Sequence, residues 1–170
     1  MNHLQSLKTL SYVQVRRILR IWIQTIIPPA ITTALYFLIF GELIGSRIGE
    51  MPGYEGLTYL EFMVPGLIML AVITNSYANV ASAFFGAKFQ KAIEEILISP
   101  MANWAILLGF IAGGIARGVL VGIVVVLVSL FFTNFGISNI FLTLFSILLS
   151  STLFSILGLI NGVYAVSYTH

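Results

Sequence analysis

Four long apolar stretches dominate the pattern of hydrophobic and polar positions along the chain. A bilayer core about 30 Å thick needs roughly 20 apolar residues in helical conformation to cross it. The four stretches cover residues 21–44, 62–85, 101–132 and 140–164. We therefore predict an all-α, polytopic membrane helix bundle of about four transmembrane helices. Together they form a transmembrane domain over residues 21–165.

Prolines fall inside two of these predicted spans. The first span contains Pro28 and Pro29, and the second contains Pro65. Proline is tolerated in a membrane helix because neighbouring helices and Ser or Thr side chains can satisfy the freed carbonyls. Two consecutive prolines should nevertheless kink or loosen the cytoplasmic third of the first span.

The segment before the first span mixes apolar and basic residues. Lys8, Arg16, Arg17 and Arg20 alternate with leucine, valine and isoleucine. Such a helix suits the cytoplasmic headgroup plane of a membrane. We predict an interfacial amphipathic helix over residues 1–20, although its first half could equally be an ordinary positively charged flank. Trp22 would serve as an interfacial anchor.

A second amphipathic segment lies between the second and third spans, over residues 87–99. One face carries Phe89, Ile93, Ile96 and Leu97, and the other carries Lys88, Gln90, Lys91, Glu94 and Glu95. Pro100 should end this helix before the third span. A minimal turn between two spans would need no amphipathic helix. The segment therefore presents a surface either to the bilayer or to a soluble partner.

Basic residues are distributed unequally between the connections. Six of them precede the first span or lie between the second and third: Lys8, Arg16, Arg17, Arg20, Lys88 and Lys91. The connection between the first and second spans has only Arg47, and the glutamates in it or at its border are Glu42, Glu50, Glu55 and Glu61. Because positive residues concentrate on the cytoplasmic side, we predict a cytoplasmic N-terminus and a location in the cell (inner) membrane.

Composition excludes most other classes of function. Hydrophobic residues make up 59% of the 170 positions and charged residues 8%, so lipid must replace water around much of the surface. The chain has no cysteine and two histidines, His3 and His170, one near each end. It also lacks a P-loop and the common hydrolase motifs. We predict no catalytic site, cofactor, metal or nucleic-acid partner, and therefore no enzyme.

Arg117 is the one charged residue inside the third span. A charge near the middle of a membrane helix costs about 2.5–3.5 kcal/mol on insertion scales, so it should face the bundle interior or a polar cavity. It could form a structural ion pair, with Glu42 or Glu61 as the nearest carboxylates, or cap backbone carbonyls. It could also take part directly in a translocation path, or snorkel along its long helix.

Small residues recur at four-residue spacing in the last two spans. They are Gly109, Gly113, Gly114, Gly118 and Gly122 in the third, and Ser151, Ser155, Gly158 and Gly162 in the fourth. Such spacing allows close helix packing in lipid. Packing within the chain and a homodimer seam are both compatible with it.

A polar stripe follows one face of the second span: Asn75, Asn79 and Ser82, with Thr74 and Ser76 beside them. These side chains could bond neighbouring helices together or line a substrate path. Thr143, Ser146 and Ser150 in the fourth span carry a weaker form of the same signal, since Ser and Thr can bond to their own helix.

The last five residues, 166–170, change character abruptly after an apolar helix. They correspond to one reading frame of a transposon end used in DNA library preparation. We interpret them as a non-native tail and expect the true protein to continue beyond about Ala165; the alternative is a short polar tail.

The order of elements resembles that of the ABC-2 type permeases, the membrane subunits of one class of ABC exporter. Two local stretches carry the likeness: residues 89–100, FQKAIEEILISP, and residues 113–118, GGIARG. The resemblance implies six spans, a homodimer and two cytoplasmic ABC ATPase subunits. It also implies that the helix at residues 87–99 sits in a cleft of the ATPase as a coupling helix. Only four spans are present here.

The resemblance predicts the permease subunit of an ATP-driven exporter. In this role, Lys88, Lys91, Glu94 and Glu95 would contact the ATPase, while Phe89, Ile93 and Leu97 would fix the helix against the membrane domain. A non-transporting membrane scaffold is the main alternative. A gradient-driven secondary transporter is disfavoured because no carboxylate lies deep in a span.

Overall fold

The computed structural model describes residues 3–45, 56, 58–99, 101–133, 136 and 139–164. Within these residues, four helical segments are long and apolar enough to cross a membrane. They are Trp22–Gly41, α4 (Tyr59–Phe89), α6 (Asn103–Phe132) and α7 (Ile140–Tyr164). The predicted all-α polytopic bundle is therefore confirmed. The suspected tail at residues 166–170 and Pro100 lie outside the described residues.

The first span consists of two kinds of helix. α1 (His3–Arg20) precedes this span and ends where the Ile21 backbone leaves helical geometry. The span itself begins with α2 (Trp22–Tyr36). α2 remains helical across Pro28 and Pro29, so the prolines do not break it. The loosening occurs further on, in the wider π-helical turns of η1 (Phe37–Gly45).

The second span begins three residues earlier than predicted. Thr58 and Glu61 form a reciprocal capping box, in which the Thr58 backbone N–H donates to the Glu61 carboxylate at 3.0 Å. The sequence pattern Thr-x-x-Glu marks this start. α4 and α6 have 31 and 30 residues, so each is about 45 Å long at 1.5 Å per residue. Both therefore exceed the thickness of a bilayer core.

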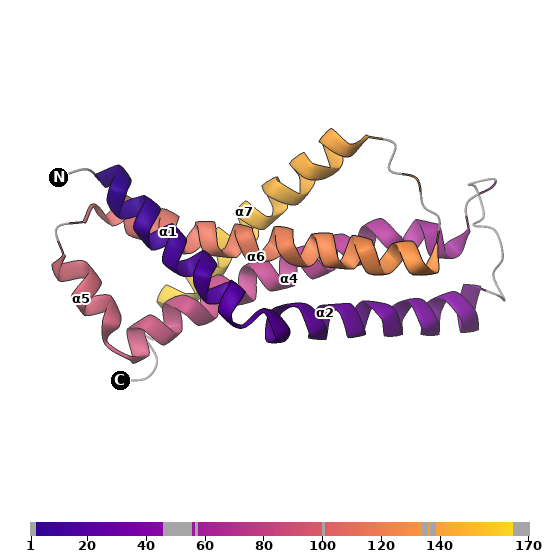
Figure 1. Ribbon diagram of the computed structural model, residues 1–170, viewed down its shortest axis with the longest axis horizontal. Helices are drawn as coiled ribbons and strands as arrows, with labels where there is room; N and C mark the ends of the chain where they lie inside the picture. The colour runs from indigo at the N-terminus through magenta and orange to yellow at the C-terminus, as the bar shows by residue number, and fades with distance from the viewer. Residues whose placement is uncertain are drawn as a thin grey trace.

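Figure 1 shows α4 and α6 side by side along the length of the molecule, with α2 next to them and α7 crossing obliquely. α5 (Ala92–Ile98) and the start of α1 lie at one end, which we call the α5 end. η1 and the start of α4 lie at the opposite end, the far end.

Two apolar clusters form the core. The far-end cluster contains Phe37, Val64, Ile68, Val72, Val121, Val125 and Ile147. The α5-end cluster contains Val80, Ala83, Phe84, Ile93, Ile106, Phe110 and Leu159. Between them lies a layer of small and polar residues from three helices: Ser76 of α4, Gly114 and Gly118 of α6, and Ser151 and Ser155 of α7. A Cβ atom at Gly114 or Gly118 would collide with the neighbouring serine side chains, so the three helices approach closely here.

α1 packs along the first half of α6 instead of standing apart from the bundle. Leu10 lies over Gly109, and Gln14 lies over Gly113, one helical turn further along each helix. The glycines leave a flat surface that accepts these side chains. Lys8, Arg16 and Arg20 remain exposed on the outer side of α1.

The predicted continuous helix over residues 87–99 is divided in the structure. α4 continues to Phe89, and the shorter α5 starts at Ala92. Between them, Lys91 adopts a left-handed backbone conformation with φ of 58°. This conformation stops helix propagation and redirects the chain, so Lys88 and Phe89 belong to α4 and not to the amphipathic helix.

Candidate functional site

The turn between α4 and α5 presents an exposed apolar surface. Phe89 is 81% exposed, Leu97 58% and Ile98 84%, whereas Ile93 is only 8% exposed. Ile93 packs in the α5-end cluster, with Ile96 partly buried against it. The expectation that Phe89 and Leu97 fix this helix to the membrane domain is therefore wrong. Ile93 and Ile96 hold α5, because the turn at Lys91 rotates its face away from that of α4.

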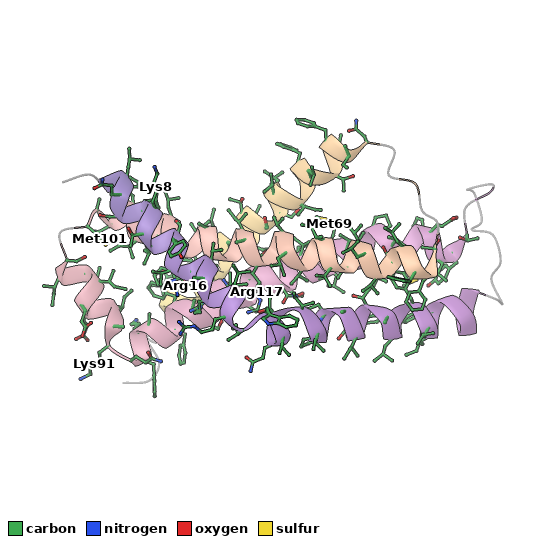
Figure 2. The ribbon with its side chains drawn as sticks, viewed as in Figure 1. Lys8, Arg16, Met69, Lys91, Met101 and Arg117 are labelled. Carbon is green, nitrogen blue, oxygen red and sulfur yellow. The ribbon has the colours of Figure 1, made fainter. Side chains whose placement is uncertain are left out.

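Charged groups surround this exposed surface. Lys91, Glu94 and Glu95 are exposed, and Lys88 is half-buried at the end of α4. Figure 2 shows Lys91 at the outermost bend of the α5 end. We call the set Phe89, Lys91, Glu94, Glu95, Leu97 and Ile98 the α5 surface. An exposed apolar patch rimmed by charges is typical of a contact with a protein or a membrane.

A pocket of about 360 Å³ lies further along the bundle, between α2, α4 and α6. α2 supplies Gln24, Pro28, Pro29, Thr32, Thr33 and Tyr36; α4 supplies Leu67, Leu70, Ala71, Thr74 and Asn75; α6 supplies Arg117. Within the first span, α2 packs chiefly on α6, whereas η1 contacts α4. The pocket therefore occupies the separation between α2 and α4.

Arg117 is half-buried on the α6 side of this pocket. Its Nε atom is buried, and no described residue accepts a hydrogen bond from it. Figure 2 places the side chain close to where α1 gives way to α2. Arg117 lies about 22 Å along α6 from Phe132 at 1.5 Å per residue, so with Phe132 at one edge of a 30 Å core it falls in the third nearest the α5 end.

Neither candidate carboxylate is a described partner of Arg117. The Glu61 carboxylate is engaged in the capping box at the far end of α4. The side chain of Glu42 lies outside the described residues. Its backbone belongs to η1, whose first residue is already about 20 Å along the span from Gln24 at 1.5 Å per residue. The predicted ion pair is thus absent among the described side chains.

A second cation lies near Arg117. The Arg17 guanidinium is close enough for the two positive charges to repel each other. Its Nη2 donates to Oδ1 of the buried Asn79 at 3.4 Å. Burial lowers the pKa of Arg17, although a guanidinium stays charged at neutral pH. α1 thus adds a second positive charge beside Arg117. The sequence pattern of the spans did not predict this neighbour.

The predicted polar stripe divides between different surroundings. Asn75 lines the pocket and donates to its own helix at Ala71 O, 3.0 Å away. Asn79 faces α1, and the Ser82 hydroxyl donates to the Asn79 carbonyl. Thr143 bonds the Asn139 carbonyl at the start of α7.

Each glycine singled out in α6 contacts another element of the same chain. Gly109 and Gly113 face α1, Gly114 faces Val80 and Ser155, Gly118 faces Ser76 and Ser151, and Gly122 faces Val72. All five are buried. The close α7–α4 contact also includes a hydrogen bond from Asn161 to the Tyr77 hydroxyl.

Among the described residues, no group of three His, Asp or Glu side chains is arranged to hold a metal ion.

A model of the ABC-2 type transporter family matches residues 5–170. The chain belongs to this family. Within it, the chain is 51% identical over 163 residues to the inner membrane transport permease YadH of Escherichia coli K12. YadH of Escherichia coli O157:H7 and of Shigella flexneri match to the same extent.

The aligned region covers 96% of this chain and 62% of each of these relatives, so the chain spans less than two thirds of their length. No solved structure matches the chain.

Proposed function

We propose that this chain is the permease part of an ATP-driven ABC-2 exporter and works with a separate cytoplasmic ATPase subunit in the inner membrane. Membership of the ABC-2 family supports this function, as do relatives named inner membrane transport permeases. The observation that carries the coupling mechanism is the α5 surface. The short helix α5 is anchored by Ile93 and leaves Leu97 and Ile98 exposed, and Phe89 is exposed at the end of α4.

The α5 surface has the features of a lever. Ile93 and Ile96 connect α5 to the cluster shared by α4, α6 and α7, so a force on α5 reaches three spanning helices. Its exposed side combines apolar side chains with both signs of charge, which suits insertion into a cleft of a soluble protein. The ATPase would supply the energy, and rearrangement of the spans would alternate access to the export path.

The proposed orientation has the N-terminus and the α5 surface in the cytoplasm. The six basic residues of α1 and of the α4–α5 region support it, because such residues concentrate on the cytoplasmic side. Topology mapping with reporters fused near Lys91 tests it. Reporter activity characteristic of the periplasm at this position would contradict both the orientation and the coupling role.

The coupling role is tested in the full-length gene product, co-expressed with a candidate cytoplasmic ABC ATPase subunit. We expect Glu94→Lys combined with Glu95→Lys to abolish co-purification of the ATPase, with the permease still present in the membrane fraction. Lys8→Glu is the matched control, since Lys8 is also exposed at the α5 end but lies on α1. Unchanged co-purification of the double variant would contradict the proposal.

Phe89→Ala provides an independent test of the same surface. Because Phe89 is 81% exposed, its truncation should leave the fold intact. A buried aromatic anchor at an interface contributes about 2 kcal/mol or more, so affinity for the ATPase should fall about 30-fold. An unchanged affinity would exclude Phe89 from the interface.

A further inference from the structure

We propose that the pocket between α2, α4 and α6 binds an anionic phosphate group, that of a lipid headgroup, and that Arg117 is the residue that holds it. The proposal is independent of the ATPase partnership, because it concerns a binding site within the described spans.

The first argument is the unmatched positive charge. No carboxylate lines the pocket, and the buried Nε of Arg117 lacks a hydrogen-bond partner among the described residues. Arg17 lies near enough to repel it. Two like charges in a medium of low dielectric constant destabilise each other, and an anion between or beside them removes that cost. A planar guanidinium also matches two phosphate oxygens at once.

The second argument is the composition of the walls. Gln24, Thr32 and Tyr36 bring N–H and O–H groups that can donate to phosphate oxygens. Leu67, Leu70 and the two prolines form an apolar remainder. A site that is cationic at one point and otherwise part polar, part apolar suits the junction between a headgroup and its acyl chains. A fully hydrated inorganic anion would have no use for the apolar part.

The third argument is access. Gln24, Thr32 and Thr74 are exposed, whereas Arg117 is half-buried behind them. The pocket therefore opens sideways, between α2 and α4. Its position in the third of the span nearest the α5 end places Arg117 within reach of the headgroup region by snorkelling. A volume of about 360 Å³ is at the lower end for ligand pockets, enough for a headgroup.

Binding of fluorescent lipids to the purified, delipidated full-length permease tests the proposal. Phosphatidylglycerol and diacylglycerol, which lacks the phosphate group, are compared by equilibrium anisotropy with the same fluorophore on the acyl chain. We expect the wild-type protein to bind phosphatidylglycerol about tenfold more tightly or better, because a guanidinium forms strong, charge-assisted hydrogen bonds to phosphate oxygens. Arg117→Gln should remove this preference.

Arg16→Gln is the matched control, because it removes one positive charge from an exposed position on α1 near the same level of the bundle. It should leave the preference unchanged. Ala71→Leu provides a second variant that keeps Arg117 and fills the pocket, and it should weaken binding of phosphatidylglycerol. Gel filtration establishes that each variant is folded.

The outcomes separate the alternatives. Competition by inorganic phosphate or glycerol phosphate, lost in Arg117→Gln, would support the anion site but identify a soluble anion as the source. Equal binding of both lipids to the wild-type protein would overturn the proposal. This result is also the one expected if another segment of the chain covers the pocket. An equal loss in Arg16→Gln and Arg117→Gln would reduce the effect to general surface charge and also overturn it.

Discussion

The contact between α4 and α7 makes a sharp prediction at Gly158. A Cβ atom at this position would lie 2.5 Å from the Tyr77 carbonyl oxygen and 3.2 Å from its carbonyl carbon. The obstacle is backbone, which cannot rotate away as a side chain can. Ordinary van der Waals contact would require the two helices to separate by about 1 Å. Overpacking of this kind costs about 1–3 kcal/mol.

Alanine also favours a helix over glycine by about 1 kcal/mol, so the net loss for Gly158→Ala should be about 0–2 kcal/mol. For a protein of this size, that corresponds to a decrease in melting temperature of up to about 6 °C. Thermal unfolding in detergent, followed by circular dichroism, measures the decrease.

Gly86→Ala is the matched control, because it introduces the same methyl group into α4 where nothing lies within 4 Å. It should leave the melting temperature unchanged or raise it slightly. Equal effects of the two substitutions would refute the close approach of α7 to Tyr77, and with it the packing of this bundle through its small-residue layer.

Three further predictions concern single positions. Lys91→Gly should stabilise the protein by about 1 kcal/mol, because glycine adopts φ of 58° without steric cost, whereas Lys91→Val should destabilise it; thermal unfolding distinguishes them. Asn139 accepts a hydrogen bond from the Leu142 N–H at 3.1 Å, so Asn139→Ala should cost about 1 kcal/mol and Asn139→Asp much less, by the same measurement. Arg117→Met should lower the apparent free energy of membrane insertion of α6 in a glycosylation-based insertion assay, by less than the roughly 2.5–3.5 kcal/mol that a charge costs at a helix centre, because Arg117 lies in the third of the span nearest the α5 end. An unchanged free energy of insertion would mean that the Arg117 side chain already escapes the hydrocarbon core by snorkelling.

Local sequence signals account for most of the element positions. Apolar length predicted the four spans to within a few residues, and a capping box at Thr58 and Glu61 would have corrected the start of α4. The split at Lys91 had no such signal. A lysine in the left-handed region is unusual. Its steric cost is offset by the packing of Ile93 against the bundle, which the sequence does not show.

Which side chains meet depended on the tertiary structure. The sequence left Arg117 with two carboxylates as candidate partners, but helical rise places Glu61 far along α4, and α1 brings a second arginine instead. The position of α1 beside α6 follows from its contact with Gly109 and Gly113, which is visible only in the tertiary structure. Small residues on one helix make room for a neighbouring helix. Their spacing along the sequence does not reveal which helix occupies that room.

The sequence by itself determined that this chain forms membrane-spanning helices, because 59% hydrophobic and 8% charged residues leave no soluble alternative. It also determined where a break in the spans exposes an amphipathic segment. The tertiary structure decided which face of that segment is anchored, and it assembled the cationic pocket from α2, α4 and α6. The physical reason is that hydropathy is a property of each segment. The pocket and the anchoring of α5 depend on how segments distant in sequence pack together.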